Sequence, residues 1–278
     1  TFADSFIHTS GSRSRCDRIS IFLWIPYNSS KEYNLFRRPD PVFLKGDEMM
    51  KAVVFNGSPR MERGFTSRLL SPLLKGIQSV GCDTELFYTS TISPRPCSCG
   101  TMHCWDKEPG ICCINDSLQP IYQKIKESEI LILAAPVYIP LPGEMQNLIN
   151  RLCPMIDPVL AIVDGRTRAK MRAGWKTEKI VLISTGGWWE KENFDTLIRI
   201  VREIAENANI VFSGAIIRPH VHLMFDRGKP TDEGKEILLK VEEAGQELVK
   251  KGTIDDALLN FISRPLVSHQ RFIETWNS

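Results

Sequence analysis

From residue 50 onward, segments that are apolar throughout alternate with amphipathic helices, and this alternation restricts the fold more than any other feature. Five short segments fit buried strands: Lys51–Asn56, Thr84–Tyr88, Ile130–Ala135, Lys179–Thr185 and Ile210–Ile217. Leucine, isoleucine and valine recur at helical spacing in most of the stretches between them. Strands become apolar throughout when helices cover both faces of a parallel sheet. We therefore predict an α/β fold, a three-layer sandwich with a five-stranded parallel sheet and helices on both faces.

Composition excludes several classes of partner. The chain has 278 residues, 42% of them hydrophobic and 24% charged, with a net charge of +2. A nearly neutral chain has no general attraction for nucleic acid or lipid surfaces, and no apolar run reaches the roughly 18 residues of a membrane span. Five of the eight cysteines crowd into Cys97–Cys113, which favours a reducing compartment over a disulfide scaffold. We expect a cytoplasmic protein without nucleic-acid or membrane partners.

The chain divides into three parts. Residues 1–49 mix serine, arginine and isolated aromatics without a helical or strand period, and Met49 and Met50 stand directly before the first predicted strand. We expect this extension to be non-native upstream sequence or a loosely ordered arm. Residues 50–264 form the predicted α/β domain, and residues 265–278 a C-terminal tail.

The loop after the first predicted strand suits a phosphate group. It runs from Asn56 to Ser67 and leads directly into a helix, whose first N–H groups and dipole favour an anion. Hydroxyl groups and one arginine can add to these donors. The candidate phosphate ligands are Ser58, Arg60, Phe65, Thr66 and Ser67. The alternative is a plain strand–helix turn in which Thr66 caps the helix.

The loops after the third and fourth predicted strands suit a flat ring, because ligands of such sheets bind outside the carboxyl ends of the strands. Three prolines stiffen the first loop, and two adjacent glycines let the backbone of the second approach a ligand closely. The candidate ring-binding residues are Pro136, Val137, Tyr138, Ile139, Thr185, Gly186, Gly187 and Trp188. Aromatic side chains packed under a helix or at a subunit interface are the alternative.

In combination, these loops resemble the NAD(P)H-dependent FMN reductase family, and most closely its branch similar to iron–sulfur flavoproteins. The matching residues are Asn56-Gly57-Ser58-Pro59-Arg60 with Gly64 and Thr66, Ala135-Pro136-Val137-Tyr138 with Pro142-Gly143 and Asn150-Arg151, Cys104-Trp105 with Pro109-Gly110, Cys112 and Asp116, and Ser184-Thr185-Gly186-Gly187-Trp188-Trp189-Glu190 with Asn193-Phe194.

The resemblance implies a flavodoxin-like fold that holds FMN, with the phosphate in the Ser58–Ser67 loop and the isoalloxazine ring between Val137–Pro140 and Gly186–Trp188. It also implies a homodimer. Family members often have asparagine where this chain has Phe65, so that contact is expected from the backbone alone.

The cysteine segment departs from the family pattern. The branch is similar to C-x2-C-x2-C followed by a fourth cysteine, whereas this chain spaces Cys97, Cys99, Cys104 and Cys112 differently. These four thiols are enough for a [4Fe–4S] cluster. A zinc site would normally include a C-x2-C pair. The irregular spacing favours reduced or redox-active thiols, with the cluster and zinc as alternatives.

These features together predict an FMN-dependent NAD(P)H oxidoreductase. Electrons would pass from NADH or NADPH through FMN to a small-molecule acceptor such as a quinone, a flavin, a nitro or azo compound or a metal. Because the cofactor carries the chemistry, we assign no catalytic acid or base. The alternatives are an electron carrier like flavodoxin, although such carriers tend to be strongly acidic and this chain is not, and a flavin or thiol redox sensor.

Residues 157–178 are expected to form a long loop before the fourth predicted strand. The segment is rich in arginine and lysine, so Arg168, Lys170 and Arg172 are candidates for drawing in NADPH phosphates across a dimer. A solvated basic loop or a dimer contact is the alternative.

Overall fold

A computed structural model describes residues 49–278. Its central sheet has five parallel strands in the order β2-β1-β3-β6-β7. The strands are β1 (Met50–Asn56), β2 (Cys82–Tyr88), β3 (Ile130–Pro136), β6 (Lys179–Thr185) and β7 (Val211–Arg218). This order is that of flavodoxin-like folds, in which the switch point between β1 and β3 forms the binding crevice. The predicted fold class is confirmed. Apart from Met49, the extension predicted for residues 1–49 lies outside the described residues.

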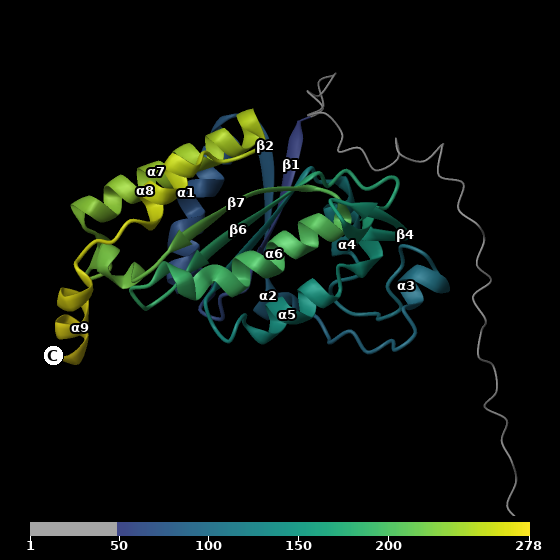
Figure 1. Cartoon of the computed structure of the whole chain (residues 1–278), viewed down its shortest axis with the longest axis horizontal. Coiled ribbons are helices and arrows are strands. Elements are labelled where there is room, and N and C mark those ends of the chain that lie inside the picture. The colour runs from purple at the N-terminus through teal and green to yellow at the C-terminus, as the bar shows by residue number, and fades with distance from the viewer. Residues whose placement is uncertain (1–48) are drawn as a thin grey trace, which may run out of the picture. The chain divides into compact units, whose positions relative to one another are not determined.

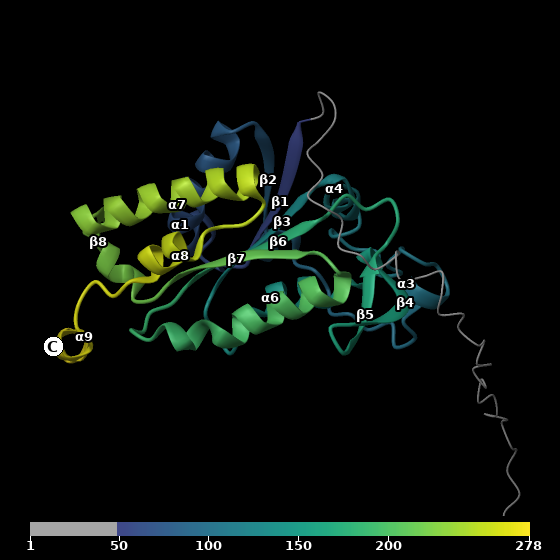
Figure 2. The same ribbon diagram turned by 45° about the horizontal axis from the view of Figure 1, so that its top comes forward.

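Helices cover both faces of the sheet (Figures 1 and 2). One layer contains α1 (Phe65–Ser79), α7 (Asp232–Lys251) and α8 (Asp256–Ser263), and the other contains α4 (Ile121–Glu127), α5 (Gly143–Asn150) and α6 (Asp195–Ala208). Successive side chains of a strand point to opposite faces. Accordingly, Ala52 and Val54 of β1 belong to the first core, and Val53 and Phe55 to the second.

Two glycines bring α1 and α7 into close contact. A Cβ atom at Gly76 would stand 1.9 Å from the Glu242 carbonyl oxygen, and one at Gly245 would stand 2.3 Å from the Leu73 oxygen. The α1 helix also continues through Pro72 in its middle, although a proline in a helix interior removes one backbone hydrogen bond.

Shorter elements surround this frame. They are α2 (Thr89–Ile92), α3 (His103–Asp106), α9 (His269–Asn277), the 3₁₀ turns η1 (Met61–Arg63), η2 (Cys153–Met155), η3 (Lys191–Phe194) and η4 (Val221–Met224), and the strand pair β8 (Phe225–Asp226) and β9 (Lys229–Pro230). Residues 265–278, predicted as a tail, thus include the helix α9. No helix within residues 49–278 combines the length and apolarity needed to cross a lipid bilayer.

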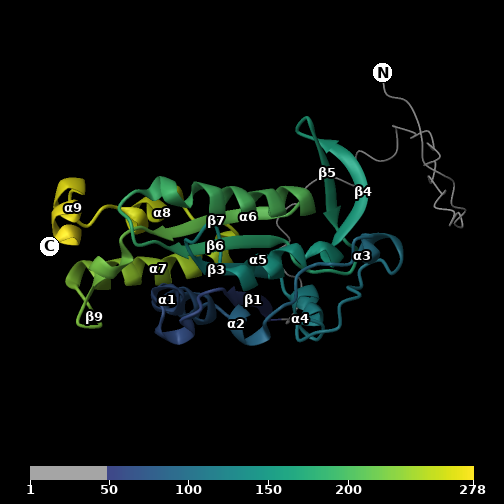
Figure 3. The same cartoon turned by 90° about the horizontal axis from the view of Figure 1, so that it is seen from below.

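The segment expected as a long basic loop folds instead as a hairpin of β4 (Ile156–Val163) and β5 (Arg166–Met171). Arg168 is buried and contacts Glu206 of α6 at 2.6 Å. Arg172 donates to the carbonyl oxygens of Pro154 and Ile156. Figure 3 shows the hairpin at the opposite end of the domain from α9. Two of the three proposed phosphate contacts are therefore occupied within the chain, because the hairpin uses them to pack on α6 and η2.

Candidate functional site

The loop after β1 is held by an asparagine. Asn56 Oδ1 accepts the Ser58 N–H at 2.9 Å, and Asn56 Nδ2 donates to Ser67 Oγ at 2.8 Å. Ser67 Oγ donates in turn to the Met61 carbonyl oxygen at 2.6 Å. These bonds fix both ends of the loop. They also occupy the Ser67 hydroxyl, which was predicted as a phosphate donor and serves here to shape the loop.

Ser58 and Gly64 form the inner wall of this loop. Ser58 is buried and its Oγ accepts the Arg60 N–H at 3.3 Å, so its hydroxyl hydrogen can be donated to an anion. A Cβ atom at Gly64 would come within 2.5 Å of Ser58 Oγ. Gly64 also precedes α1 and provides no side-chain cap. The first N–H groups of α1 are therefore available to a phosphate.

Thr66 connects the loop to the end of β6. Its Oγ1 lies 2.8 Å from Thr185 Oγ1, and both side chains are buried. Phe65 points away from the loop and stacks on Phe225 with ring centroids 5.5 Å apart. Phe65 was expected to contact the phosphate through its backbone alone. The packing of its ring on Phe225 is compatible with that role, which stays a prediction.

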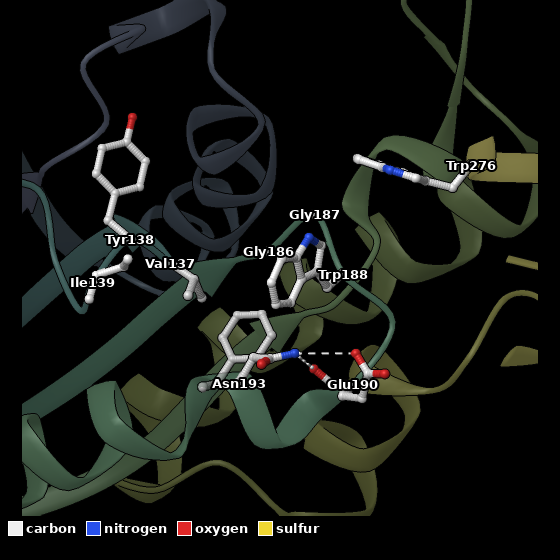
Figure 4. A pocket seen from close by; sticks show the side chains of 10 residues that line it. Val137, Tyr138, Ile139, Gly186, Gly187, Trp188, Glu190, Asn193 and Trp276 are labelled. Atoms are coloured by element: carbon white, nitrogen blue, oxygen red, sulfur yellow. Dashed lines mark hydrogen bonds between the residues drawn. The ribbon is translucent and has the colours of Figure 1, made fainter. Parts of the chain in front are cut away.

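A cleft of about 520 Å³ opens beside the ends of β3 and β6 (Figure 4). The Val137 N–H donates to the Thr185 carbonyl oxygen at 2.9 Å and joins the two loops. A Cβ atom at Gly186 would stand 2.8 Å from the Phe194 ring, whereas one at Gly187 would meet nothing within 4 Å. Gly187 therefore presents bare backbone to open space, as a flat ring requires. The cleft is within the size range of small-molecule sites.

The structure gathers six of the predicted ring-binding residues around this cleft. They are Val137, Tyr138, Ile139, Gly186, Gly187 and Trp188. Pro136 and Thr185 stand at the strand ends behind them. Glu190, Asn193, Phe194 and Trp276 also line the cleft. The first three follow Trp188 closely and belong to the motif that carried the resemblance. Trp276 comes from α9, and its only sequence signal was the apolar spacing of Phe272, Ile273 and Trp276.

A buried pair of basic side chains lies behind the cleft loop. Arg218, at the end of β7, donates to the carbonyl oxygens of Ile262 and Arg264 at 2.7 and 2.8 Å. Its Nη2 lies 2.8 Å from His220 Nε2, which also accepts the Leu266 N–H at 3.1 Å. Burial, with the charge of Arg218, lowers the pKa of His220 to about 4. Neutral His220 therefore ties the segment before α9 to the sheet.

A second hollow, of about 10 Å³, lies among cysteine side chains at the C-terminal end of α5. Six thiols line it: Cys97, Cys99, Cys104, Cys112, Cys113 and Cys153. Cys153 belongs to η2 and comes from far along the chain, so the cysteine spacing did not reveal it. Among residues 49–278, no three His, Cys, Asp or Glu side chains stand in a metal-binding arrangement. The hollow has room for about one water molecule.

The thiols differ in acidity. Burial raises the pKa of Cys104 to about 11 and also raises the pKa of Cys153. A hydrogen bond from the His103 backbone holds the pKa of Cys99 below its ordinary value. Cys99 therefore forms a thiolate more readily than Cys104 and Cys153, and the thiolate is the form that attacks disulfides and binds metals.

Arg151 anchors the cysteine segment. Its guanidinium is fully buried and binds Asp116 with two hydrogen bonds of 2.8 and 3.1 Å. It also donates to Cys112 Sγ at 3.1 Å and to the carbonyl oxygens of Arg95 and Ile114. Burial alone would raise the pKa of Asp116, but the hydrogen bonds from Arg151 and Arg95 outweigh it and hold that pKa below its usual range.

The sequence model of the NADPH-dependent FMN reductase family matches residues 50–191. The chain belongs to this family. The match contains β1, β3 and β6 and the loops that follow them, and it ends before α9.

Curated relatives point to the same branch. An iron–sulfur flavoprotein of Archaeoglobus fulgidus is 35% identical over 107 residues, which is 38% of this chain and 46% of that protein. One from Methanocaldococcus jannaschii is 35% identical over 107 residues, 38% of this chain and 53% of that protein. The match spans about half the length of these relatives.

Solved structures agree with the fold. An NAD(P)H:quinone oxidoreductase from Methanothermobacter marburgensis superimposes with a TM-score of 0.51 at 15% identity, covering 73% of this chain and 98% of that one. An FMN-dependent NADH-azoreductase from Bacillus anthracis, in complex with FMN, gives 0.51 at 11% identity, covering 74% and 100%. At these identities the likeness concerns the fold alone.

Proposed function

We propose that the chain is an FMN-dependent oxidoreductase that takes two electrons from NADH or NADPH and passes them to a small-molecule acceptor. The observation that carries this proposal is the cleft between the β3 and β6 loops, where Gly187 presents bare backbone, together with the uncapped N-terminus of α1, which the Thr66–Thr185 contact joins to the end of β6. A ring in the cleft and a phosphate at α1 are the two ends of FMN. The balanced reaction is NAD(P)H + H⁺ + acceptor → NAD(P)⁺ + reduced acceptor.

The residues of the chain would bind and orient the cofactor. The Ser58 hydroxyl and the first N–H groups of α1 would hold the phosphate. Val137, Tyr138 and Trp188 would enclose the ring. When bound, FMN supplies the two-electron chemistry itself. The Gly186 N–H already donates to the Arg218 carbonyl oxygen at 3.0 Å, which leaves the Gly187 N–H as the candidate donor for negative charge on a reduced ring.

Anaerobic stopped-flow mixing tests this proposal. The FMN-loaded protein is mixed with NADPH or NADH, and the visible absorbance of the oxidised flavin is followed. We expect rapid bleaching with at least one nucleotide and recovery when a quinone is added. A flavin that binds but is not reduced by either nucleotide would identify an electron carrier instead. A homodimer and a cytoplasmic location are further proposals, and light scattering tests the first.

We also propose an iron–sulfur cluster at Cys97, Cys99, Cys104 and Cys112. Two observations favour it: six thiols converge on one hollow, and the curated relatives described above are named iron–sulfur flavoproteins. Thiols are the required donors, but among residues 49–278 they do not stand in a metal-binding arrangement and the hollow has only about 10 Å³, so the cysteine segment must rearrange to admit a cluster. A bound cluster would supply one-electron transfer.

Iron and acid-labile sulfide analysis after anaerobic reconstitution tests the cluster. We expect iron and sulfide in equal amounts in the wild type and their loss in Cys104→Ser. The control is Cys82→Ser, because Cys82 is buried at the start of β2, in the core that contains α1 and α7, and does not line the hollow. Absence of iron in the reconstituted wild type would leave the thiols as redox-active groups.

A further inference from the structure

Helix α9 is attached to the cleft by aromatic contacts. Trp189 stacks on His269 with ring centroids 4.7 Å apart and donates from Nε1 to the Val267 carbonyl oxygen at 2.9 Å. Phe272 is buried and packs on His220 at 6.1 Å and on His222 at 6.0 Å. The Trp189 contacts fix the start of the helix to the loop that carries Gly187 and Trp188, and the Phe272 contacts fix its middle to the segment after β7.

This attachment places Trp276 at the cleft. Its ring packs on Phe272 at 5.8 Å and on His222 at 5.7 Å, yet 60% of the side chain is exposed. In Figure 4, Tyr138 and Trp276 stand on opposite sides of the space over Gly187, with Trp188 between them. The neighbouring Ile273 on α9 is also exposed but is not among the cleft residues. Trp276 is therefore the side chain through which α9 reaches the cleft.

We propose that Trp276 is a specificity-determining residue and that its indole forms the outer wall of the acceptor site, selecting planar aromatic acceptors over compact non-aromatic ones. The proposal rests on the function proposed above. Three aromatic side chains that are half exposed or more, Tyr138 at 51%, Trp188 at 65% and Trp276, surround one opening. Aromatic faces left in water around a cleft gain stability when a second aromatic ring stacks between them.

Helix α9, which carries this wall, lies outside the region that the family model matches. The loops after β1, β3 and β6 lie within residues 50–191, whereas Trp276 lies beyond them. The residues assigned to the cofactor thus lie within the family match, whereas the part of the acceptor wall that comes from α9 lies outside it. Changing Trp276 is expected to alter which acceptor is used while the phosphate loop stays intact.

Calorimetric titration tests the wall independently of catalysis. The FMN-loaded, oxidised protein is titrated with anthraquinone-2-sulfonate, a planar quinone that does not react with oxidised flavin. We expect Trp276→Ala to raise the dissociation constant about tenfold, Trp276→Phe to recover most of that loss, and Ile273→Ala to behave as the wild type. Unchanged binding in Trp276→Ala overturns the proposal.

Steady-state kinetics then tests selectivity. In a ping-pong scheme kcat/KM for the acceptor does not depend on the donor half-reaction, so menadione and ferricyanide can be compared directly. We expect the ratio of their kcat/KM values to fall about tenfold in Trp276→Ala. If neither nucleotide reduces the flavin, the proposed function fails, while the calorimetric result still decides on the wall. A change of oligomeric state in Trp276→Ala with unchanged binding would assign the indole to a subunit contact instead.

Discussion

The two hollows of this domain are built by different means. The cleft over Gly187 is formed by the loops at the carboxyl ends of parallel strands and has a volume of about 520 Å³. The cysteine hollow has about 10 Å³ and is shaped by cysteine side chains, of which Cys112 is bound by the buried Arg151. A site built on strand-end loops follows from the topology of the sheet. A site made of side chains depends on a few contacts, any one of which can remove it.

The largest effect is expected from Arg151→Met, which should break the cysteine hollow and spare the cleft. The substitution leaves the Asp116 carboxylate buried without its guanidinium, and breaking such a pair costs about 3–5 kcal/mol. Urea unfolding measures the loss. FMN affinity, measured by flavin fluorescence, should stay close to that of the wild type.

A matched control is available on the same carboxylate. Arg95 Nε stands 3.9 Å from Asp116 Oδ2, and 60% of the Arg95 side chain is exposed. Exposed pairs contribute about 1 kcal/mol or less, so Arg95→Met should be mild. If Arg95→Met destabilises the protein as much as Arg151→Met, the burial argument is wrong.

The opposite test perturbs the cleft and spares the cysteine hollow. Gly187→Leu should fill the cleft without straining the fold. A Cβ atom at this position meets nothing within 4 Å, so the leucine side chain would occupy the space assigned to the ring. We expect FMN affinity to fall at least about a hundredfold, or roughly 2.7 kcal/mol, with unchanged urea unfolding of the apoprotein. Gly143→Leu is the control, because its Cβ also meets nothing within 4 Å and it lies outside the cleft lining. Equal FMN loss in both variants would argue against the ring assignment.

A smaller effect is expected at the phosphate end. Ser58→Ala removes one hydroxyl donor while the N–H groups of α1 persist, so we expect about a tenfold loss of FMN affinity. Ser71→Ala is the control, since Ser71 is an exposed serine of α1 beyond the loop. Unchanged FMN affinity in Ser58→Ala would assign phosphate binding to the helix N-terminus alone.

The contrast between the two hollows also explains which parts of the fold and of the sites could be predicted from the sequence. The parallel strands and the loops that line the cleft were predictable, because apolar strands, glycine pairs and prolines act locally. The partner of Cys112 was not, because Arg151 and Cys153 reach the hollow from beyond β3 and α5. The same holds for Trp276: its helix α9 is short, and the packing of Phe272 on His220 and of Trp276 on His222 places it at the cleft. The hairpin at Ile156–Met171 was missed because two of its arginines, Arg166 and Arg168, form ion pairs with Glu203 and Glu206 of α6, and the sequence does not show this long-range pairing.

The smallest effect concerns pH and the attachment of α9. His220 Nε2 accepts from both Arg218 and Leu266, so it must be unprotonated in the folded state, and its pKa lies at about 4, below the ordinary value of 6.5. Because the pKa of His220 is lower in the folded than in the unfolded state, its stabilising contribution is greatest at a pH above the unfolded-state pKa. This contribution is lost as the pH falls from the unfolded-state pKa toward the folded-state pKa. Between pH 7 and pH 6 this loss amounts to roughly 0.7 kcal/mol. His220→Gln keeps a neutral acceptor at every pH, so the difference between the unfolding free energies of the variant and the wild type should narrow or reverse over that interval. A pH-independent difference would show that protonation of His220 does not control the anchoring of α9.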